Sequence, residues 1–212
     1  MCRLLYIRSN SPITISTHLR AFAQSVKLSK EYQGDGWGIF YLNPSNEWSS
    51  HVEITPIWKS NFNQFPKTKL VIAHARSAFL GTDICIENNM PFWDGRYAFI
   101  FNGELHGVKI RADGKIGAEK IFNFIKRFNQ TNNILQAIKK GITIIENRSD
   151  YIKAMNIIIA DKEHAYLSTF FNEDPAYFTM YEMITDDLLI LSSIPYFDAD
   201  WIPISNKTIK VY

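Results

Sequence analysis

The sequence predicts an α+β fold with mostly antiparallel sheets. Several strand-like runs precede two amphipathic helical stripes, and further strand-like runs follow them. This order is typical of α+β domains, whereas regular alternation of strand and helix would indicate a parallel sheet. The chain has 212 residues, of which 46% are hydrophobic, so it is long enough to bury a substantial core. We therefore expect one domain over residues 1–212.

Apolar runs bounded by turn residues predict the strands of the first half. They cover residues 2–8, 37–42, 51–58, 69–75 and 96–101. Ile15, Leu19, Phe22 and Val26 fall on one face of a helix, after Ser and Thr residues that could cap it. Residues 80–95 are rich in Asn, Gly and Pro and are expected to be irregular.

Two helical stripes occupy the middle of the chain. They consist of Ala118, Ile121, Phe122, Ile125 and Phe128, and of Ile134, Leu135, Ile138, Ile142 and Ile145. Both stripes follow helical spacing and predict amphipathic helices. Strand signals return at residues 154–160, 164–171, 176–182 and 187–192, with a last one near 207–211.

The composition argues against several classes of protein. The net charge is +2 and the charges are spread along the chain, so no patch for nucleic acid or a membrane surface is predicted. No apolar run approaches the roughly 20 residues of a membrane span, and the short LLYI run is no signal peptide. Cys2 and Cys85 make no disulfide framework. A reducing cytoplasm is therefore the expected location.

A cysteine follows the first methionine directly. Methionine in front of a small residue can be removed, which would leave Cys2 with a free α-amine of ordinary pKa about 7.7–8.0. That amine could take the thiol proton itself, directly or through a water, so no histidine is required. Cys2 is therefore a candidate nucleophile. The alternative is an incidental cysteine near a frayed chain end.

A cysteine that attacks an amide also needs donors for the oxyanion. The stretch FIFNGEL at 99–105 could supply a side-chain amide from Asn102 and a backbone N–H from Gly103. Glycine would let the backbone approach a ligand closely. The alternative is a hairpin turn, because Asn-Gly is a strong turn signal.

Arg76 ends an apolar strand in the stretch IAHARSA. Its guanidinium suits bidentate capture of a substrate carboxylate, and the alternative is a solvated arginine at a strand end. His74 lies two residues earlier, on the same face of the strand. Because no second His or Cys stands at ligand spacing, we expect a hydrogen-bonded structural histidine rather than a base or a zinc ligand.

The stretch GDGWG at 34–38 lacks the G-x-G-x-x-G spacing of a dinucleotide loop, and no helical pattern opens behind it. We predict a glycine-rich turn that brings backbone against the site. No cofactor and no metal are expected.

Taken in series, CRLLYIRS, GDGWGI, HAR, NNMPF and FNG resemble the class II glutamine amidotransferases. The resemblance is specific over residues 2–125 and fainter to the end, where LSSIPYFDADWIPI is similar to the family's Ser-Glu-Pro…Trp stretch. The opening looks most like the stand-alone branch, which includes γ-glutamyl hydrolases of glutathione and ergothioneine metabolism. This resemblance implies a four-layer αββα fold of the N-terminal nucleophile hydrolases.

The resemblance also implies roles for individual residues. Cys2 would be the nucleophile with its own amine as base, and Arg76 would grip the α-carboxylate of a glutamyl group. Asn102 and the N–H of Gly103 would form the oxyanion hole, and Gly34 would lie where a family turn lines the pocket. These roles agree with the chemistry read from the residues.

Two departures from the family pattern bear on the substrate. The family places an Asp that binds the substrate α-amino group where KIGAEKIF has Gly117, while Glu119 matches a family Glu of structural role. The family's Asn-x-His-Pro appears as NNMP at 88–91. Either another acid replaces the missing Asp, with Asp113, Glu104 and Glu119 as the candidates, or the substrate is not a simple free α-amino acid.

The sequence therefore predicts an N-terminal cysteine amidohydrolase that cleaves the γ-amide of glutamine or of a γ-glutamyl conjugate through a thioester. No synthase domain is recognised, so released ammonia would need a separate synthase partner or would be lost. The alternative is a catalytically weak or inactive subunit that binds or regulates. A zinc or nucleotide enzyme is not favoured.

Overall fold

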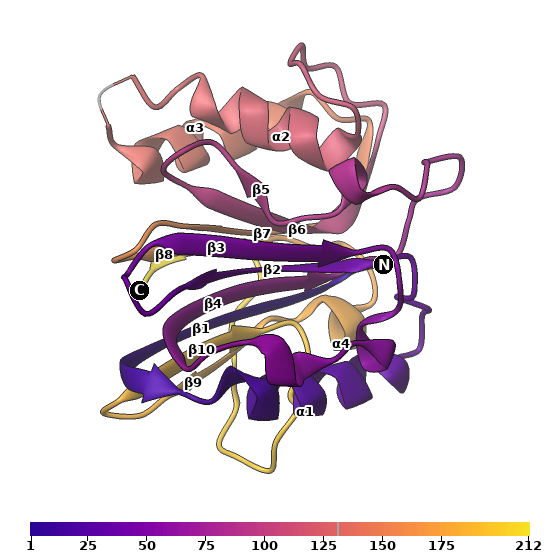
Figure 1. The fold of residues 1–212 in the computed structure, drawn as a ribbon. Coiled ribbons are helices and arrows are strands. Elements are labelled where there is room, and N and C mark those ends of the chain that lie inside the picture. Colours follow the sequence, from indigo (N-terminus) through magenta and orange to yellow (C-terminus); the bar gives the residue numbers. More distant parts are fainter. Residues whose placement is uncertain (131) are drawn as a thin grey trace.

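Two antiparallel sheets face each other in the computed structural model, which describes residues 1–130 and 132–212 (Figure 1). The larger sheet has the order β11 (Ile202–Pro203), β9 (Tyr181–Ile184), β10 (Leu188–Ser192), β1 (Arg3–Ile13), β4 (Thr68–Ala75), β2 (Trp37–Leu42), β3 (Trp48–Glu53). The smaller sheet has the order β12 (Thr208–Val211), β8 (Ala165–Thr169), β7 (Tyr151–Ala160), β6 (Ala98–His106), β5 (Phe92–Trp93). This arrangement confirms the predicted antiparallel sheets.

Helices cover the outer face of each sheet (Figure 1). Helix α1 (Ile15–Lys27) packs on the larger sheet, and α2 (Gly117–Lys126) and α3 (Ile134–Asn147) pack on the smaller one. Shorter turns of helix are η1 (Ile57–Lys59), η2 (Phe62–Gln64), η3 (Ile86–Asn88) and α4 (Pro175–Phe178). The layers therefore follow the order α, β, β, α, as expected from the sequence.

Strand β1 is buried on both faces. Leu4 and Tyr6 point into the core between the two sheets, whereas Leu5 and Ile7 belong to the core beneath α1. Successive side chains of a strand point to opposite faces, so a continuous apolar run fits a strand in the middle of a sandwich. β1 also pairs with both β4 and β10, so the backbone near the start of the chain is held on both edges.

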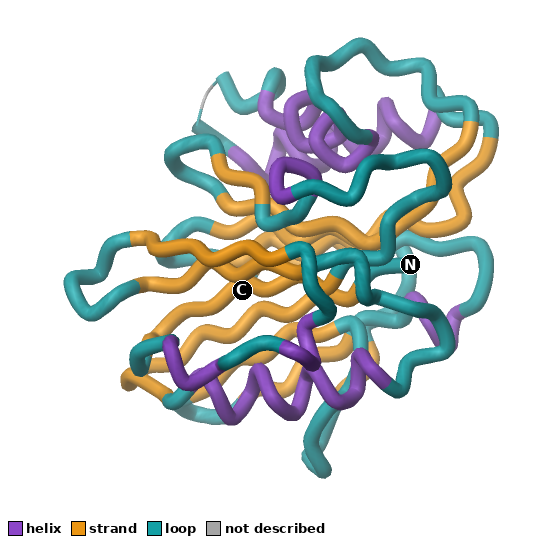
Figure 2. The backbone as a smooth tube through the Cα atoms, turned by 45° about the vertical axis from the view of Figure 1, so that its right-hand side comes forward, coloured by secondary structure: helices purple, strands orange, loops and turns teal. Residues whose placement is uncertain are grey.

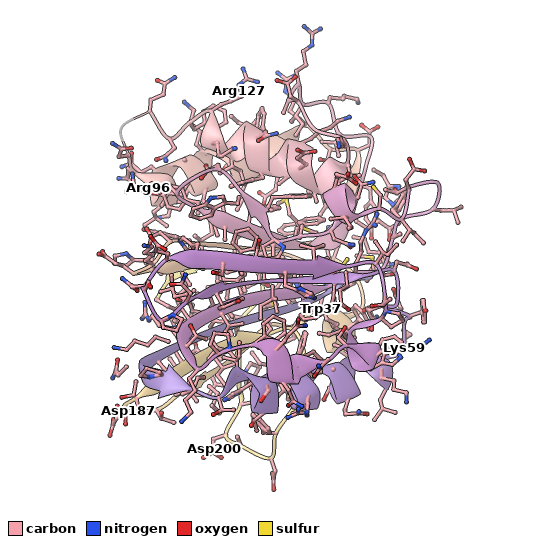
Figure 3. The ribbon with its side chains drawn as sticks, in the orientation of Figure 1. Trp37, Lys59, Arg96, Arg127, Asp187 and Asp200 are labelled. Atoms are coloured by element: carbon pink, nitrogen blue, oxygen red, sulfur yellow. The ribbon has the colours of Figure 1, made fainter. Side chains whose placement is uncertain are left out.

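Trp37 illustrates how the core holds a large side chain, and two arginines mark the opposite end of the molecule. In Figure 3, Trp37 lies between the larger sheet and the α1 layer, while Arg96 and Arg127 lie at the α2–α3 end of the molecule. Trp37 is fully buried, and its indole N–H donates to the Ser60 hydroxyl at 2.7 Å. A buried indole is well accommodated when its one donor is satisfied.

Two predicted strands differ from the structure. Residues 51–58 divide into the end of β3 and the turn η1, which begins directly after Pro56. Residues 176–182 begin as α4, in which Pro175 takes the first helical position, and only then enter β9. Proline lacks an N–H and is preorganised for the first turn of a helix, which explains both differences.

Loops gather at the end of the strands where the chain begins (Figure 2). They include residues 76–91, between β4 and β5, and residues 107–116, between β6 and α2. Among the described residues, no helix is both long and apolar enough to cross a membrane.

Candidate active site

A cavity of about 780 Å³ opens among these loops. Its wall brings together Cys2, Arg76, Gly103 and Gly117, which come from four separate parts of the sequence. Volumes of roughly 300–1,000 Å³ are usual for sites that hold small organic molecules. Four of the six residues singled out from the sequence therefore share one cavity.

Cys2 stands immediately before β1. Its Sγ lies 3.5 Å from both the backbone nitrogen and the carbonyl oxygen of Ser77. Burial raises the pKa of this thiol, while the Ser77 N–H, the N-terminal ammonium and Arg76 oppose the increase. With Met1 in place, the thiol is therefore held in its protonated form and no amine is available to accept its proton.

Arg76 follows β4 directly, and its backbone N–H donates to the carbonyl of Gly36 at 2.8 Å. Arg76 as a whole is only 3% exposed, and its Nη2 donates to the backbone carbonyl of Asp83 at 3.0 Å. Nη1 is buried without a hydrogen-bond partner. An unpaired guanidinium nitrogen is costly to bury, so this group is suited to an anionic ligand in the cavity. The alternative of a solvated arginine is inconsistent with this burial.

Asn102 and Gly103 lie within β6, opposite Asn156 and Met155 of β7. Asn102 is fully buried, and neither its amide nitrogen nor its amide oxygen has a partner. Gly103 allows a close approach, because a Cβ there would lie 2.2 Å from the Ala154 carbonyl oxygen. The hairpin-turn alternative is therefore wrong, since the Asn-Gly pair continues a strand rather than ending one.

Gly117 is the first residue of α2 and lines the cavity. A Cβ at this position would meet nothing within 4 Å, so the missing side chain leaves open space. Lys115 and Lys120 also line this part of the cavity. The local charge is therefore basic where the family pattern has an acid.

The acids proposed as replacements have other contacts. Glu119 accepts the backbone N–H of Lys115 at 2.6 Å. Glu104 reaches the cavity wall but is paired with His106 at 2.8 Å and with Lys153 at 3.4 Å. Asp113 is not part of the cavity wall. To replace the family's Asp, Glu119 or Glu104 would have to give up these contacts, and Asp113 would have to move to the cavity.

The glycine-rich turn supports the site from behind. Gly36 has a backbone φ of +119°, which residues with a side chain rarely adopt. Its carbonyl oxygen accepts the hydrogen bond from the backbone N–H of Arg76. Asp35 accepts the backbone N–H of Ala78 at 2.8 Å. Gly34 is covered by the ring of Tyr32 and does not line the cavity, so its role in substrate binding stays a prediction.

His74 is fully buried between the sheets. We expected a hydrogen-bonded histidine, yet neither ring nitrogen makes a hydrogen bond of ordinary distance and angle, although the backbone of Phe101 lies close enough to favour the charged ring. Burial and the charge of Arg76 lower its pKa to about 3, so the ring is neutral. Among the described residues, no group of three or more His, Cys, Asp or Glu could hold a metal ion.

Sequence reasoning missed the contacts of Met1, the residue directly before Cys2. The carbonyl oxygen of Met1 accepts hydrogen bonds from Gln33 Nε2 at 3.0 Å and from Tyr177 Oη at 2.6 Å. The Met1 ammonium forms an ion pair with Glu31. Gln33 was visible beside the glycine-rich turn, but Tyr177 is 175 residues from Cys2 in the sequence and carried no signal.

Comparison with known families and proteins gives a consistent result. A family described as "Glutamine amidotransferases class-II" matches residues 1–166, which is more than three quarters of the chain. The comparison with curated proteins gave no match.

Several solved structures have the same fold. The glutamine phosphoribosylpyrophosphate amidotransferase of B. subtilis aligns with a TM-score of 0.68 at 15% identity, covering 100% of this chain and 49% of that one. A class II domain protein from Silicibacter pomeroyi aligns with a TM-score of 0.68 at 13% identity, covering 99% and 94%. A predicted glutamine amidotransferase from Pseudomonas aeruginosa aligns with a TM-score of 0.57 at 16% identity, covering 100% and 97%. The chain thus spans about half of the first structure and nearly all of the other two.

Proposed function

The chain belongs to the class II glutamine amidotransferases, and on this premise we propose that it is an N-terminal cysteine amidohydrolase. Its substrate would be the γ-amide of glutamine or of a γ-glutamyl conjugate. The observation that carries the proposal is the shared cavity of Cys2, Arg76 and Gly103, with the unpartnered amide of Asn102 in the strand behind it.

Before any reaction, removal of Met1 gives Cys2 a free α-amine. The first half of the reaction then forms the thioester. The amine takes the thiol proton while Sγ attacks the γ-carbonyl carbon, and the carbonyl electron pair moves onto oxygen. Asn102 Nδ2 and the N–H of Gly103 donate to this oxyanion. Donors fixed in a strand need no reorganisation as the charge develops, which makes them effective.

The amine then gives its proton to the leaving nitrogen, the C–N bond breaks, and ammonia or an amine departs. In the second half, water attacks the thioester while the amine accepts a water proton. The same oxyanion hole serves this step. The C–S bond breaks, the thiolate regains its proton from the amine, and a glutamyl carboxylate is released.

Arg76 would hold the α-carboxylate of the substrate through its unpartnered Nη1. The backbone bonds of Arg76 to the glycine-rich turn fix the position of the guanidinium relative to Cys2. Holding the substrate by its charged end aligns the γ-carbonyl with the nucleophile, which lowers the entropic part of the barrier.

The size of the cavity suits a γ-glutamyl conjugate larger than glutamine, and its charge near Gly117 disfavours a free α-ammonium in either substrate. About 780 Å³ leaves room for a group beyond the glutamyl unit. The lysines near Gly117 do not suit a free ammonium, so substrates whose amino group is blocked or differently placed are expected to fit better. Where ammonia is released, a separate synthase partner would accept it or it would be lost.

We also propose that residues 1–212 form a single class II amidotransferase-like domain. Both sheets support this, because β10 pairs with β1 in the larger sheet and β7 pairs with β6 in the smaller one. The C-terminal third of the chain therefore completes sheets that the first two thirds begin.

The proposal is tested with processed protein, verified by intact mass to lack Met1. Glutamine, γ-glutamyl dipeptides and N-acylated γ-glutamyl amides are compared by release of ammonia or amine. Turnover of at least one substrate is expected, with Cys2→Ala inactive as the control. No turnover of any of them, together with retained binding of a γ-glutamyl compound, would indicate a binding or regulatory subunit instead.

A further inference from the structure

Met1 lies in a closely fitted site beside Cys2. Its ammonium pairs with Glu31 and its carbonyl oxygen accepts from Gln33 and Tyr177. Its side chain packs against the cluster of Ala154, Tyr177 and Phe178. None of these residues lines the large cavity, so this site is separate from the one proposed for the substrate.

The two donors to the Met1 carbonyl are themselves held in place. Gln33 is fully buried, and its Nε2 also donates to Tyr177 Oη at 2.9 Å. The ring of Tyr177 lies 3.7 Å from the Arg3 guanidinium, whose Nη1 donates to the carbonyl of Tyr177 at 3.0 Å. Gln33 and Tyr177 therefore form a fixed polar pair directly beside the start of the chain.

Removal of Met1 would take away the acceptor that both donors share. Gln33 Oε1 is already buried without a partner, so the pair would then have still fewer of its hydrogen bonds satisfied. Buried polar groups in this condition are strongly disfavoured. The same cleavage turns the backbone nitrogen of Cys2, one peptide bond away, into a primary amine.

The processed amine and this pair are chemically complementary. A neutral primary amine offers two N–H donors and one lone pair. The side-chain amide of Gln33 can turn over to present Oε1 as an acceptor, and the Tyr177 hydroxyl can accept as well. With both N–H groups engaged, the lone pair is left for the thiol proton.

Building on the proposed function, we propose that Gln33 and Tyr177 position the α-amine of processed Cys2, directly or through one water at the former Met1 carbonyl. Both are neutral at physiological pH, so they orient the amine without holding it as an ammonium. A carboxylate in the same place would stabilise the ammonium and remove the base. Gln33 and Tyr177 are thus positioning residues.

The charged groups around the amine come from several elements. Glu31 and Asp35 lie in the loop before β2, Arg3 lies on β1, and Arg76 follows β4. Glu31 reaches the Met1 ammonium, one residue beyond the amine of processed Cys2. These groups include both acids and bases. A carboxylate introduced at position 33 would add a negative charge, which raises the pKa of the amine only if the two groups are close together.

The test measures the amine separately from catalysis. In processed Cys2→Ala protein, the pKa of the α-amine is read from the pH dependence of trace acetylation of the N-terminal peptide by mass spectrometry. Adding Gln33→Glu should raise this pKa by about 1–3 units, as expected for an opposite charge in contact. Gln136→Glu, an exposed position on α3, is the matched control and should leave it unchanged.

A second variant covers the case in which Gln33→Glu fails to fold. Tyr177→Phe in the catalytic protein should lower kcat about tenfold or more while KM stays near wild type, because positioning of the base acts on the chemical step. An unshifted amine pKa in folded Gln33→Glu, or an unchanged kcat in Tyr177→Phe, would overturn the inference. If wild-type protein turned over no γ-glutamyl substrate, the proposed function would fail, yet the amine pKa would still decide this inference.

Discussion

Two parts of the candidate site are built differently. Asn102 and Gly103 lie within β6, which pairs with β7 in a defined register, and Cys2 directly precedes β1, which pairs on both edges. Gly117 instead begins a helix, is exposed to solvent and has open space around it. On the proposed function, the sheets would hold the reacting groups, whereas substrate choice would depend on a loop and a helix start that tolerate change.

Removal of the nucleophile should have the largest effect. Cys2→Ala is expected to abolish hydrolysis, because Cys85, the other cysteine on the cavity wall, has no α-amine of its own to take the thiol proton. Retention of Met1 should be nearly as damaging, since its carbonyl acylates the amine that serves as base. Activity and intact mass are measured on the same sample, and a Cys2→Ala protein with normal turnover would contradict the mechanism.

The oxyanion hole comes next. Asn102→Ala should lower kcat by about 10²–10³, as for removal of one oxyanion donor, with little change in KM. The folded state should lose little, because the Asn102 amide makes no hydrogen bond that the substitution would break. Asn102→Asp is the matched variant, nearly isosteric but without a donor, and should be at least as slow. A strong increase in KM with kcat within a few-fold would make Asn102 a binding residue.

The next largest effect should come from Arg76, the residue proposed to bind the α-carboxylate of the substrate. Arg76→Lys keeps the positive charge but cannot reproduce the planar fork, so kcat/KM for γ-glutamyl substrates should fall by about 10–100-fold. The loss should be much smaller for substrates that lack the α-carboxylate. Equal loss for substrates with and without this carboxylate would show that Arg76 acts through the fold rather than through the substrate.

The sequence predicts the parts of this site that lie in or next to single strands. Apolar runs place Cys2 at the start of the first strand and Arg76 at the end of the strand over 69–75, and the motif series links them to a family. The fold class follows from the same patterns. The strand predicted over 176–182 is wrong for residues 176–178, which are helical, and right for its end, which enters β9; an apolar run of this length does not distinguish a strand from a short helix.

The contacts of Met1 could not be predicted in this way. Tyr177 reaches the chain start only because β10 returns beside β1 and brings α4 with it. The sequence likewise predicts His74 to be a satisfied structural residue, and only the packing of the two sheets shows that its ring makes no hydrogen bond of ordinary geometry. Contacts between distant segments depend on tertiary packing, which one sequence does not encode as a local pattern.

The sharpest test of the comparison concerns Gly117, where the expected effect is no larger than that of Arg76→Lys and is confined to the KM for glutamine. If the cavity lacks an amino-binding acid, Gly117→Asp should lower the KM for glutamine by about 10–100-fold, because a carboxylate there would pair with the substrate ammonium. The open space around Gly117 accommodates the side chain, and an acid in the first turn also suits the helix dipole. Gly117→Asn is the matched control: it has similar volume without the charge and should leave the KM for glutamine high. Wild-type protein that already uses glutamine efficiently, with Gly117→Asp neutral or harmful, would contradict the idea. Glu104 or Asp83, the acids on the cavity wall, would then be the residues that hold the amine.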